Sequence, residues 1–296
     1  MPTGRGTIVV ALGGNAVAPA HERPTISNQF RHTRESLAPI VDLARAGWNI
    51  ALVHGNGPQV GDELARNELS AGQLEPLPLG VLVAGTAGWM GYMIQQSLQN
   101  ALRRAGVDRT VVTLITQTLV DADDPQLREP TKPIGHGKWR RLAPSPRPIA
   151  IVERAMVQTL VRDGYIVIAC GGGGPPVYDD RALGLEGVDA VADKDRVAAI
   201  LGREIAAQVL LILTDVDAVY RGWGTPAQRA IPRLSLAEAD QLLEGGELGT
   251  GSMRPKVEAA ADFVRSGGER AIIAELAHGL AALQGEAGTT IAKETG

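Results

Sequence analysis

The chain has 296 residues, enough for one large α/β domain or two small lobes with a buried core. Hydrophobic residues make up 44% and charged residues 21%, as in ordinary globular proteins, and the formal net charge of −4 argues against a nucleic-acid partner. No stretch reaches the roughly 18 apolar residues of a membrane span, no signal-peptide pattern occurs, and the single Cys170 excludes an intramolecular disulfide. These features predict a soluble cytoplasmic protein.

Short apolar, β-branched runs alternate with longer helical patterns along the chain. In chain order, the expected strands are 7–12, 49–54, 110–116, 165–170, 209–214 and 270–275. The expected helices are 33–46, 58–69, 88–105, 150–162, 194–206, 235–244 and 255–266. Apolar strands separated by helices predict an α/β fold with a mainly parallel sheet covered on both faces. Right-handed crossovers then place the carboxyl ends of the strands along one edge.

The least regular stretch is 121–148, which contains six prolines. Because proline fixes its own backbone, this stretch predicts a stiff, extended excursion rather than a flexible linker.

Glycine-rich turns follow several of the expected strands. The first strand ends in Gly13-Gly14-Asn15, the second in His54-Gly55-Asn56-Gly57, and the fourth in the run Gly171–Gly174. Ligands of open α/β sheets bind beyond the carboxyl ends of the strands, and glycine turns there expose bare backbone N–H groups. Two of these turns lead toward a helix, whose N-terminus favours anions. The pattern predicts a site for phosphate or another small anion.

The anion site would not be of either common nucleotide-binding design. Neither the P-loop pattern nor the dinucleotide-binding G-x-G-x-x-G fingerprint is present. Phosphoryl transfer still needs cations, and three lysines lie in segments with the expected loop character: Lys132, Lys194 and Lys256.

With these motifs assembled, the sequence closely resembles the carbamate kinases of the amino-acid kinase superfamily. The matching stretches are VVALGGNA (9–16), HGNGPQVG (54–61), GYMIQQSL (91–98), PTKPIG (130–135), PSPRP (144–148), CGGGGPPV (170–177), GVDAVADKD (187–195), LILTDVD (211–217) and GSMRPK (251–256). They cover nearly the whole chain in order.

The resemblance implies a three-layer αβα fold with about eight strands and a homodimer. It implies reversible phosphoryl transfer between carbamoyl phosphate and ADP, with Mg²⁺ accompanying the nucleotide and no metal ligand assigned directly. It further implies two approximate lobes, 1–185 for the phosphoryl acceptor and 186–296 for the nucleotide. A place in arginine metabolism would fit, although other sources of carbamoyl phosphate fit as well.

The resemblance also implies roles for particular residues. Those expected to act in catalysis are Lys132, Lys256, Asp195 and Asp193, with Asp195 holding the lysines in register and Asp193 sharing that task or reaching Mg²⁺ through water. Those expected to surround carbamate and the transferred group are Gly13, Gly14, Asn15, Gly55, Asn56, Gly57, Gly172 and Gly173. Those expected near the nucleotide are Lys194, Thr214, Asp215, Asp217, Tyr220 and Met253.

Plainer interpretations exist for several of these residues. Asp193 and Asp195 could simply cap the helix that follows, and Asp215 and Asp217 could be turn acids. His54 is expected to be a packed, hydrogen-bonded histidine rather than a catalyst, and Cys170 a small core residue.

The chain departs from the family in one segment. Typical carbamate kinases carry a long insertion between the motifs PTKPIG and PSPRP, which forms a subdomain over the site. Here only residues 136–143 join them, too few for an independent subdomain, and Gly137–Arg141 resembles a remnant. A lid excludes water and completes a site. The possibilities are therefore a more open carbamate kinase, a kinase for another small acid or phosphate acceptor, or a non-catalytic nucleotide-binding protein.

Overall fold

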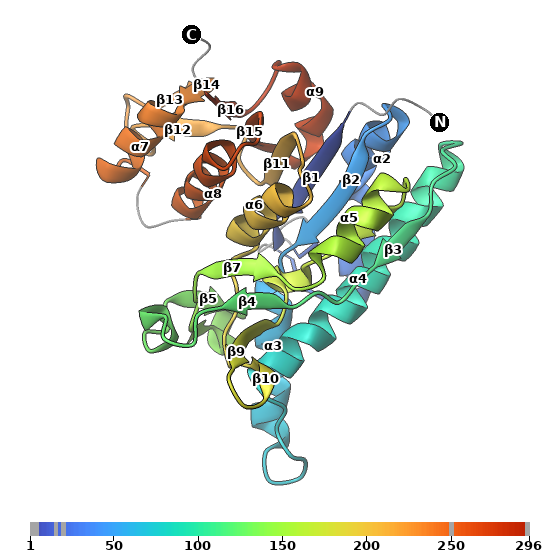
Figure 1. The fold of residues 1–296 in the computed structure, drawn as a ribbon, viewed down its shortest axis with the longest axis vertical. Coiled ribbons are helices and arrows are strands. Elements are labelled where there is room, and N and C mark those ends of the chain that lie inside the picture. Colours follow the sequence, from blue (N-terminus) through green and yellow to red (C-terminus); the bar gives the residue numbers. More distant parts are fainter. Residues whose placement is uncertain (1–5, 15–16, 19–21, 249–251, 294–296) are drawn as a thin grey trace.

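In the computed structural model, which describes residues 6–14, 17–18, 22–248 and 252–293, eight strands form one large sheet (Figure 1). The β15–β16 pair is antiparallel and the other neighbouring pairs are parallel, so two strands at one edge run against the other six. From edge to edge the strands are β14 (Arg233–Ser235), β16 (Thr289–Ala292), β15 (Arg270–Glu275), β11 (Val209–Thr214), β1 (Thr7–Leu12), β2 (Asn49–His54), β8 (Ile166–Ile168) and β3 (Val111–Thr113). The predicted mainly parallel sheet of about eight strands is confirmed.

Helices cover both faces of this sheet, as Figure 1 shows. They are α1 (Ile26–Ser36), α2 (Ala38–Arg45), α3 (Gly57–Ser70), α4 (Leu79–Arg104), α5 (Arg154–Arg162), α6 (Lys194–Glu204), α7 (Leu236–Glu244), α8 (Met253–Arg265) and α9 (Gly279–Gln284). No helix among the described residues has the length and apolar character needed to cross a membrane.

The period-two alternation of the strands divides the core into two layers. In β1, Val9 and Ala11 pack with side chains of α5, α6, α7 and α8, whereas Ile8 and Val10 pack with side chains of α2, α4 and α9. Since every residue of β1 is buried, the sheet is the middle layer of a three-layer αβα arrangement.

Three helices have bounds other than those predicted, and α9 was not predicted. The predicted helix 33–46 is two helices, because Pro39 in the first turn of α2 lacks the N–H that would continue α1. Helix α4 begins at Leu79 instead of 88, because Leu82 and Val83 are buried in a small core cluster that outweighs the weak helix propensity of the nearby glycines. Helix α5 begins at Arg154 instead of 150, because residues 148–151 are still extended in a strand.

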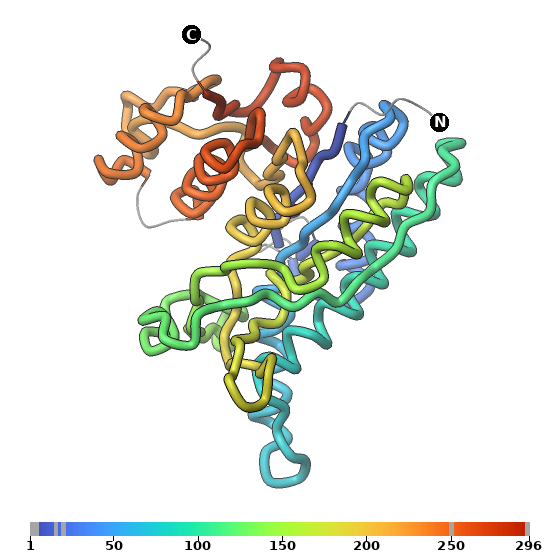
Figure 2. The backbone as a smooth tube through the Cα atoms, in the orientation of Figure 1, coloured from blue at the N-terminus to red at the C-terminus, as the bar shows by residue number. Residues whose placement is uncertain are grey.

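A second, four-stranded sheet was not predicted. Figure 2 shows the green segment that follows β3 lying beside the yellow segment that follows residue 174. Its strands, in order, are β10 (Gly184–Gly187), β9 (Pro176–Asp180), β4 (Thr118–Val120) and β7 (Pro148–Ile151). They are short and rich in proline and glycine, so they lack the alternation that marks a strand in a sequence.

Part of the proline-rich excursion, between β4 and β7 in the sequence, folds as a small two-stranded ribbon. β5 (Lys132–Ile134) pairs antiparallel with β6 (Arg141–Ala143), and one 3₁₀ turn, Gly137–Trp139, joins them. The amide of Gly135 donates to the carbonyl of Gly57 over 2.9 Å, which fastens the ribbon to the start of α3. The segment expected to be shortened is therefore a ribbon and not a subdomain. A further hairpin pairs β12 (Val219–Arg221) with β13 (Arg229–Ile231).

Candidate active site

A cleft of about 960 Å³ opens beyond the carboxyl ends of the central strands. Its walls bring together residues that are far apart in the sequence. They include Gly13, Gly14, Gly55, Asn56, Gly57, Gly172, Lys132, Asp193, Lys194, Asp195, Thr214, Asp215 and Lys256. The three glycine turns and the three lysines that the sequence singled out thus share one cleft.

The run Gly171–Gly174 adopts backbone conformations that other residues rarely take. Cys170 has φ +51°, and Gly172, Gly173 and Gly174 have φ values of +67°, +87° and +73°. A Cβ atom on Gly172 would lie 2.1 Å from Nδ2 of Asn56, and one on Gly173 would lie 2.5 Å from the carbonyl oxygen of Ala192. The glycines are therefore required both by left-handed backbone and by close approach at the floor of the cleft.

Replacing Gly172 by alanine is expected to lower the free energy of unfolding by about 3 kcal/mol, through left-handed strain and the clash with Asn56. Gly285 is the matched control, because it has φ +81° and an added Cβ atom would meet nothing within 4 Å. Gly285→Ala should cost only about 1 kcal/mol. Urea unfolding of both variants measures the difference, and equal losses would show that close approach contributes nothing.

The turn after β2 presents the start of α3 to the cleft. Asn56 is the N-cap of α3 but does not cap it with its side chain; its Nδ2 donates to Oγ1 of Thr86 over 2.8 Å. Asn56 is buried, and Gly57 and Pro58 line the cleft. An uncapped helix N-terminus carries partial positive charge and suits an anion.

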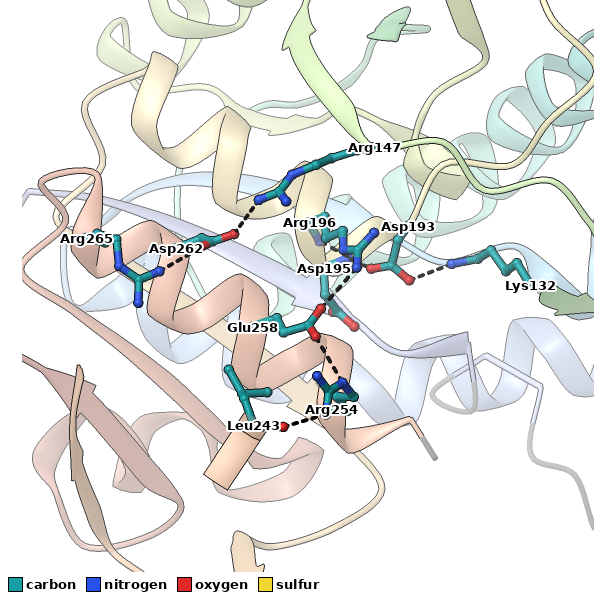
Figure 3. A network of polar contacts seen from close by, with 10 residues as sticks. All are labelled: Lys132, Arg147, Asp193, Asp195, Arg196, Leu243, Arg254, Glu258, Asp262 and Arg265. Carbon is teal, nitrogen blue, oxygen red and sulfur yellow. Dashed lines mark hydrogen bonds and ion pairs between the residues drawn. The ribbon is translucent and has the colours of Figure 1, made fainter. Parts of the chain in front are cut away.

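Two aspartates and three lysines form a cluster in the cleft, part of which Figure 3 shows. Oδ1 of Asp195 lies 2.6 Å from Nζ of Lys194, and its Oδ2 lies 3.5 Å from Nζ of Lys256. Lys132 Nζ lies 2.6 Å from Oδ2 of Asp193. Lys256 also donates to the carbonyl of Ser252 over 3.0 Å. The structure thus places Asp195 between two of the lysines, whereas Lys132 contacts Asp193.

Asp193 has two of the contacts that the sequence left open, a helix cap and a lysine partner. It caps α6, since its Oδ1 accepts hydrogen bonds from the amides of Asp195 and Arg196, and it pairs with Lys132. Burial by itself raises the pKa of the Asp193 carboxyl, but Lys132 and Lys194 outweigh it and hold that pKa well below its ordinary value. Burial and repulsion from Lys194 lower the pKa of the Lys256 ammonium, and the two aspartates oppose that shift.

The lowered pKa of Asp193 predicts acid sensitivity. A carboxylate with a lower pKa in the folded than in the unfolded chain stabilises the fold fully above about pH 4 and loses that contribution as the pH falls further. Asp193→Asn should therefore be less stable than the wild type at pH 7, and the gap should narrow below about pH 4. Urea unfolding at both pH values tests this, and a gap independent of pH would contradict it.

The residues expected near the nucleotide do not all line the cleft. Thr214 and Asp215 line it, and Oγ1 of Thr214 donates to Oδ1 of Asp215 over 3.1 Å. Tyr220 instead donates its hydroxyl to Asp217, and both lie outside the described lining. Met253 begins α8 and packs against the core. Gly173, unlike Gly172, is not among the residues that line the cleft, and Asn15 falls outside the described residues.

Cys170 has the environment expected for a packed residue, whereas His54 is packed but only partly hydrogen-bonded, because its Nε2 is buried without a partner among the described residues. His54 is buried, its Nδ1 faces the carbonyl of Gly55 at 3.1 Å, and burial lowers its pKa to about 4. The neutral imidazole therefore supports the turn after β2. Cys170 is fully buried, and burial raises the pKa of its thiol to about 12, so it is not a nucleophile.

Four charged residues of the cleft were missed by the sequence analysis: Arg140, Arg196, Arg254 and Glu275. Glu275 ends β15 and could have been found from the carboxyl end of the predicted strand 270–275. Arg196 follows the assigned Asp195, and Arg254 lies two residues before the assigned Lys256. On a helix, however, only packing decides which of the neighbouring side chains face a cleft.

A cleft with bare glycine backbone, a helix N-terminus and clustered lysines, set beyond the carboxyl ends of parallel strands, is the site of an enzyme that binds nucleotides and transfers phosphoryl groups. The amino acid kinase family model matches residues 6–275. This chain belongs to that family, among the carbamate kinases.

The relatives support this placement over the whole chain. A carbamate kinase of Pyrococcus horikoshii is 39% identical over 311 residues, covering 96% of this chain and 98% of the relative. One of Halobacterium salinarum is 44% identical over 306 residues, covering 96% and 97%. The solved carbamate kinase from Giardia lamblia bound to AMP-PNP superposes with a TM-score of 0.93 at 36% identity, covering 99% and 100%. Because these alignments are longer than 296 residues, the relatives contain segments that this chain lacks.

Proposed function

We propose that this chain is a carbamate kinase, which transfers the phosphoryl group of carbamoyl phosphate to ADP and can run in reverse. The bond from phosphorus to the carbamoyl oxygen breaks, a bond from phosphorus to a β-phosphate oxygen of ADP forms, and carbamate and ATP result. Carbamate then releases ammonia and carbon dioxide. The observation that carries the proposal is the Lys194–Asp195–Lys256 group facing the glycine turns in one cleft.

The acceptor side of the cleft suits a small planar anion. We assign it Gly13, Gly14, Gly55, Asn56, Gly57 and Gly172, which line the cleft, with Gly173 and Asn15 proposed from their motifs alone. Bare backbone can approach carbamate where side chains would not fit, and the start of α3 adds partial positive charge. Since the transfer needs no strong base, positioning and neutralisation of charge supply most of the catalysis.

The lysines would neutralise the transferred group. We propose that Lys132 and Lys256 flank it, that Asp195 holds Lys194 and Lys256 in register, and that Asp193 holds Lys132. The distances of 2.6 to 3.5 Å between these side chains support the assignment.

The nucleotide would occupy the side of the cleft formed by β11 and α8. We propose Lys194, Thr214 and Asp215 as its contacts in the cleft, and Asp217, Tyr220 and Met253 near the adenosine. Within the described residues no three His, Cys, Asp or Glu side chains gather as a metal site. Mg²⁺ commonly binds through substrate phosphates and one or two carboxylates. It would therefore arrive with the nucleotide and balance phosphate charge, with Asp193 reaching it through water.

A comparison of acyl phosphates tests the acceptor. The purified protein, ADP and Mg²⁺ are given either carbamoyl phosphate or acetyl phosphate, and ATP is measured. ATP formation with carbamoyl phosphate but not with acetyl phosphate supports the proposal. Preference for acetyl phosphate would assign a different small acid, and ADP binding without any ATP would leave a binding protein.

Four further properties are proposed on the resemblance. They are a homodimer, a cytoplasmic location, a place in arginine metabolism, and two lobes, 1–185 and 186–296. The strand order supports the lobes, because β1, β2, β8 and β3 come from the first part and β11, β15, β16 and β14 from the second.

A further inference from the structure

A single carboxylate holds two arginines at the cleft. Oε2 of Glu258 lies 3.0 Å from Nη2 of Arg196, and its Oε1 lies 3.1 Å from Nε of Arg254 (Figure 3). Arg254 also donates from Nη1 to the carbonyl of Leu243 over 2.7 Å. Arg254 and Glu258 are one turn apart on α8, and Arg196 is in the first turn of α6. The three side chains therefore tie the starts of two helices together.

The two guanidinium groups remain accessible from the cleft. Arg196 and Arg254 both line it, with side-chain exposures of 28% and 42%, whereas Glu258 is not part of the described lining. Each guanidinium has five N–H donors, and the contacts above use only some of them. The free donors can therefore reach a ligand, while the carboxylate stays behind them.

The charge around the cleft is unbalanced in favour of cations. Six described lining residues are basic and four are acidic. Lys132, Lys194 and Lys256 pair with only two carboxylates, those of Asp193 and Asp195. Arg196 and Arg254 pair with only one, that of Glu258, so each group carries one more positive charge than negative. A fixed guanidinium fork matches phosphate oxygens in pairs, so this surplus charge is suited to a phosphate.

The position of the pair selects the nucleotide rather than the acyl phosphate. α6 and α8 belong to the part of the chain whose strand β11 carries the proposed nucleotide contacts. Carbamoyl phosphate brings one phosphoryl group, for which Lys132 and Lys256 are already proposed. ADP brings two more phosphates, and these need cations of their own.

We propose that Arg254 and Arg196 bind the phosphates of the nucleotide and that Glu258 is a positioning residue that holds both arginines. This inference rests on the proposed function for the identity of the reaction, but it can be tested by binding alone. It predicts that losing either arginine weakens ADP binding and leaves the affinity for carbamoyl phosphate unchanged.

The test measures ADP binding with Mg²⁺ by calorimetry for Arg254→Gln and Arg196→Gln. Loss of a charged hydrogen-bond donor to phosphate should raise the dissociation constant about tenfold. Arg265→Gln is the matched control, since Arg265 is an ion-paired arginine on α8 outside the described lining, and it should change the constant by less than about twofold. Arg254→Lys should recover part of the loss, because a cation returns without the fork.

Steady-state kinetics then separate a positioning role of Glu258 from a general loss of structure. Glu258→Gln should raise KM for ADP severalfold with kcat and KM for carbamoyl phosphate little changed, because only the arginines lose their anchor. ADP affinities of the arginine variants within twofold of the wild type, or a rise in KM for carbamoyl phosphate instead, would overturn the inference. If the wild type makes no ATP but Arg254→Gln still weakens ADP binding, the inference stands and the proposed function fails. A wild type that does not bind ADP would overturn both.

Discussion

Replacing Lys256 by methionine is expected to lower kcat by about 10³-fold or more, because a positioned cation on the transferred phosphoryl group stabilises charge that develops in the transition state. Lys256 is only 6% exposed, and methionine has a similar length without the charge. The variant should still fold, because burial already disfavours the charged form of Lys256. The Asp195 carboxylate also keeps an ion pair, with Lys194. Steady-state kinetics and urea unfolding measure the two effects separately.

The control for this variant is Lys293→Met. Lys293 is an exposed lysine near the C-terminal end of the described residues and has no proposed role. It should keep the wild-type rate. If Lys256→Met also keeps it, Lys256 does not contact the transferred group.

Replacing Asp195 by asparagine is expected to reduce both stability and activity. The side chain is 3% exposed and holds Lys194 and Lys256, so the amide would leave two mostly buried ammonium groups without their counter-charge. Removing one partner of a buried ion pair costs about 3 kcal/mol. The rate should fall about 100-fold or more, because displacement of a catalytic group by about 1 Å is enough for that loss.

Asp262→Asn is the matched control for Asp195→Asn. Asp262 also joins two cations, Arg147 at 3.2 Å and Arg265 at 2.8 Å, but its side chain is 44% exposed. Solvent screens such a pair, so this variant should lose less than about 1 kcal/mol and keep its rate. Equal losses from the two variants would show that burial of Asp195 is not what makes it important.

The central strands were predictable from sequence because burial on both faces makes them continuously apolar. β1, β2, β11 and β15 have the predicted bounds. The edge strands β14 and β16 and the second sheet were not predictable, since each is short and is held by pairing with a distant segment. Thr118 of β4, for example, pairs with Pro176 and Ile151, and no local sequence pattern predicts these pairings.

The part of the site that is built from backbone could be predicted from the sequence. Glycine runs at strand ends placed three turns of the cleft correctly at one edge of the sheet. The partners of the lysines were only partly predictable, because the long side chain of Lys132 reaches Asp193, two residues before the Asp195 that the other two lysines share. Arg196 and Arg254 needed the packing of α6 against α8 before their shared Glu258 could be seen.

The most direct test of carbamate kinase activity is to follow carbamoyl phosphate and ADP with the wild-type protein and Mg²⁺ by ³¹P NMR, beside a sample without protein. If the chain is a carbamate kinase, the signal of carbamoyl phosphate falls as the γ-phosphate signal of ATP rises in equal amount, far faster than carbamoyl phosphate decays alone. That result would also show that the β5–β6 ribbon suffices over this site. Decay to inorganic phosphate at the rate of the protein-free sample, with no γ-phosphate signal, would show that the chain is not a carbamate kinase.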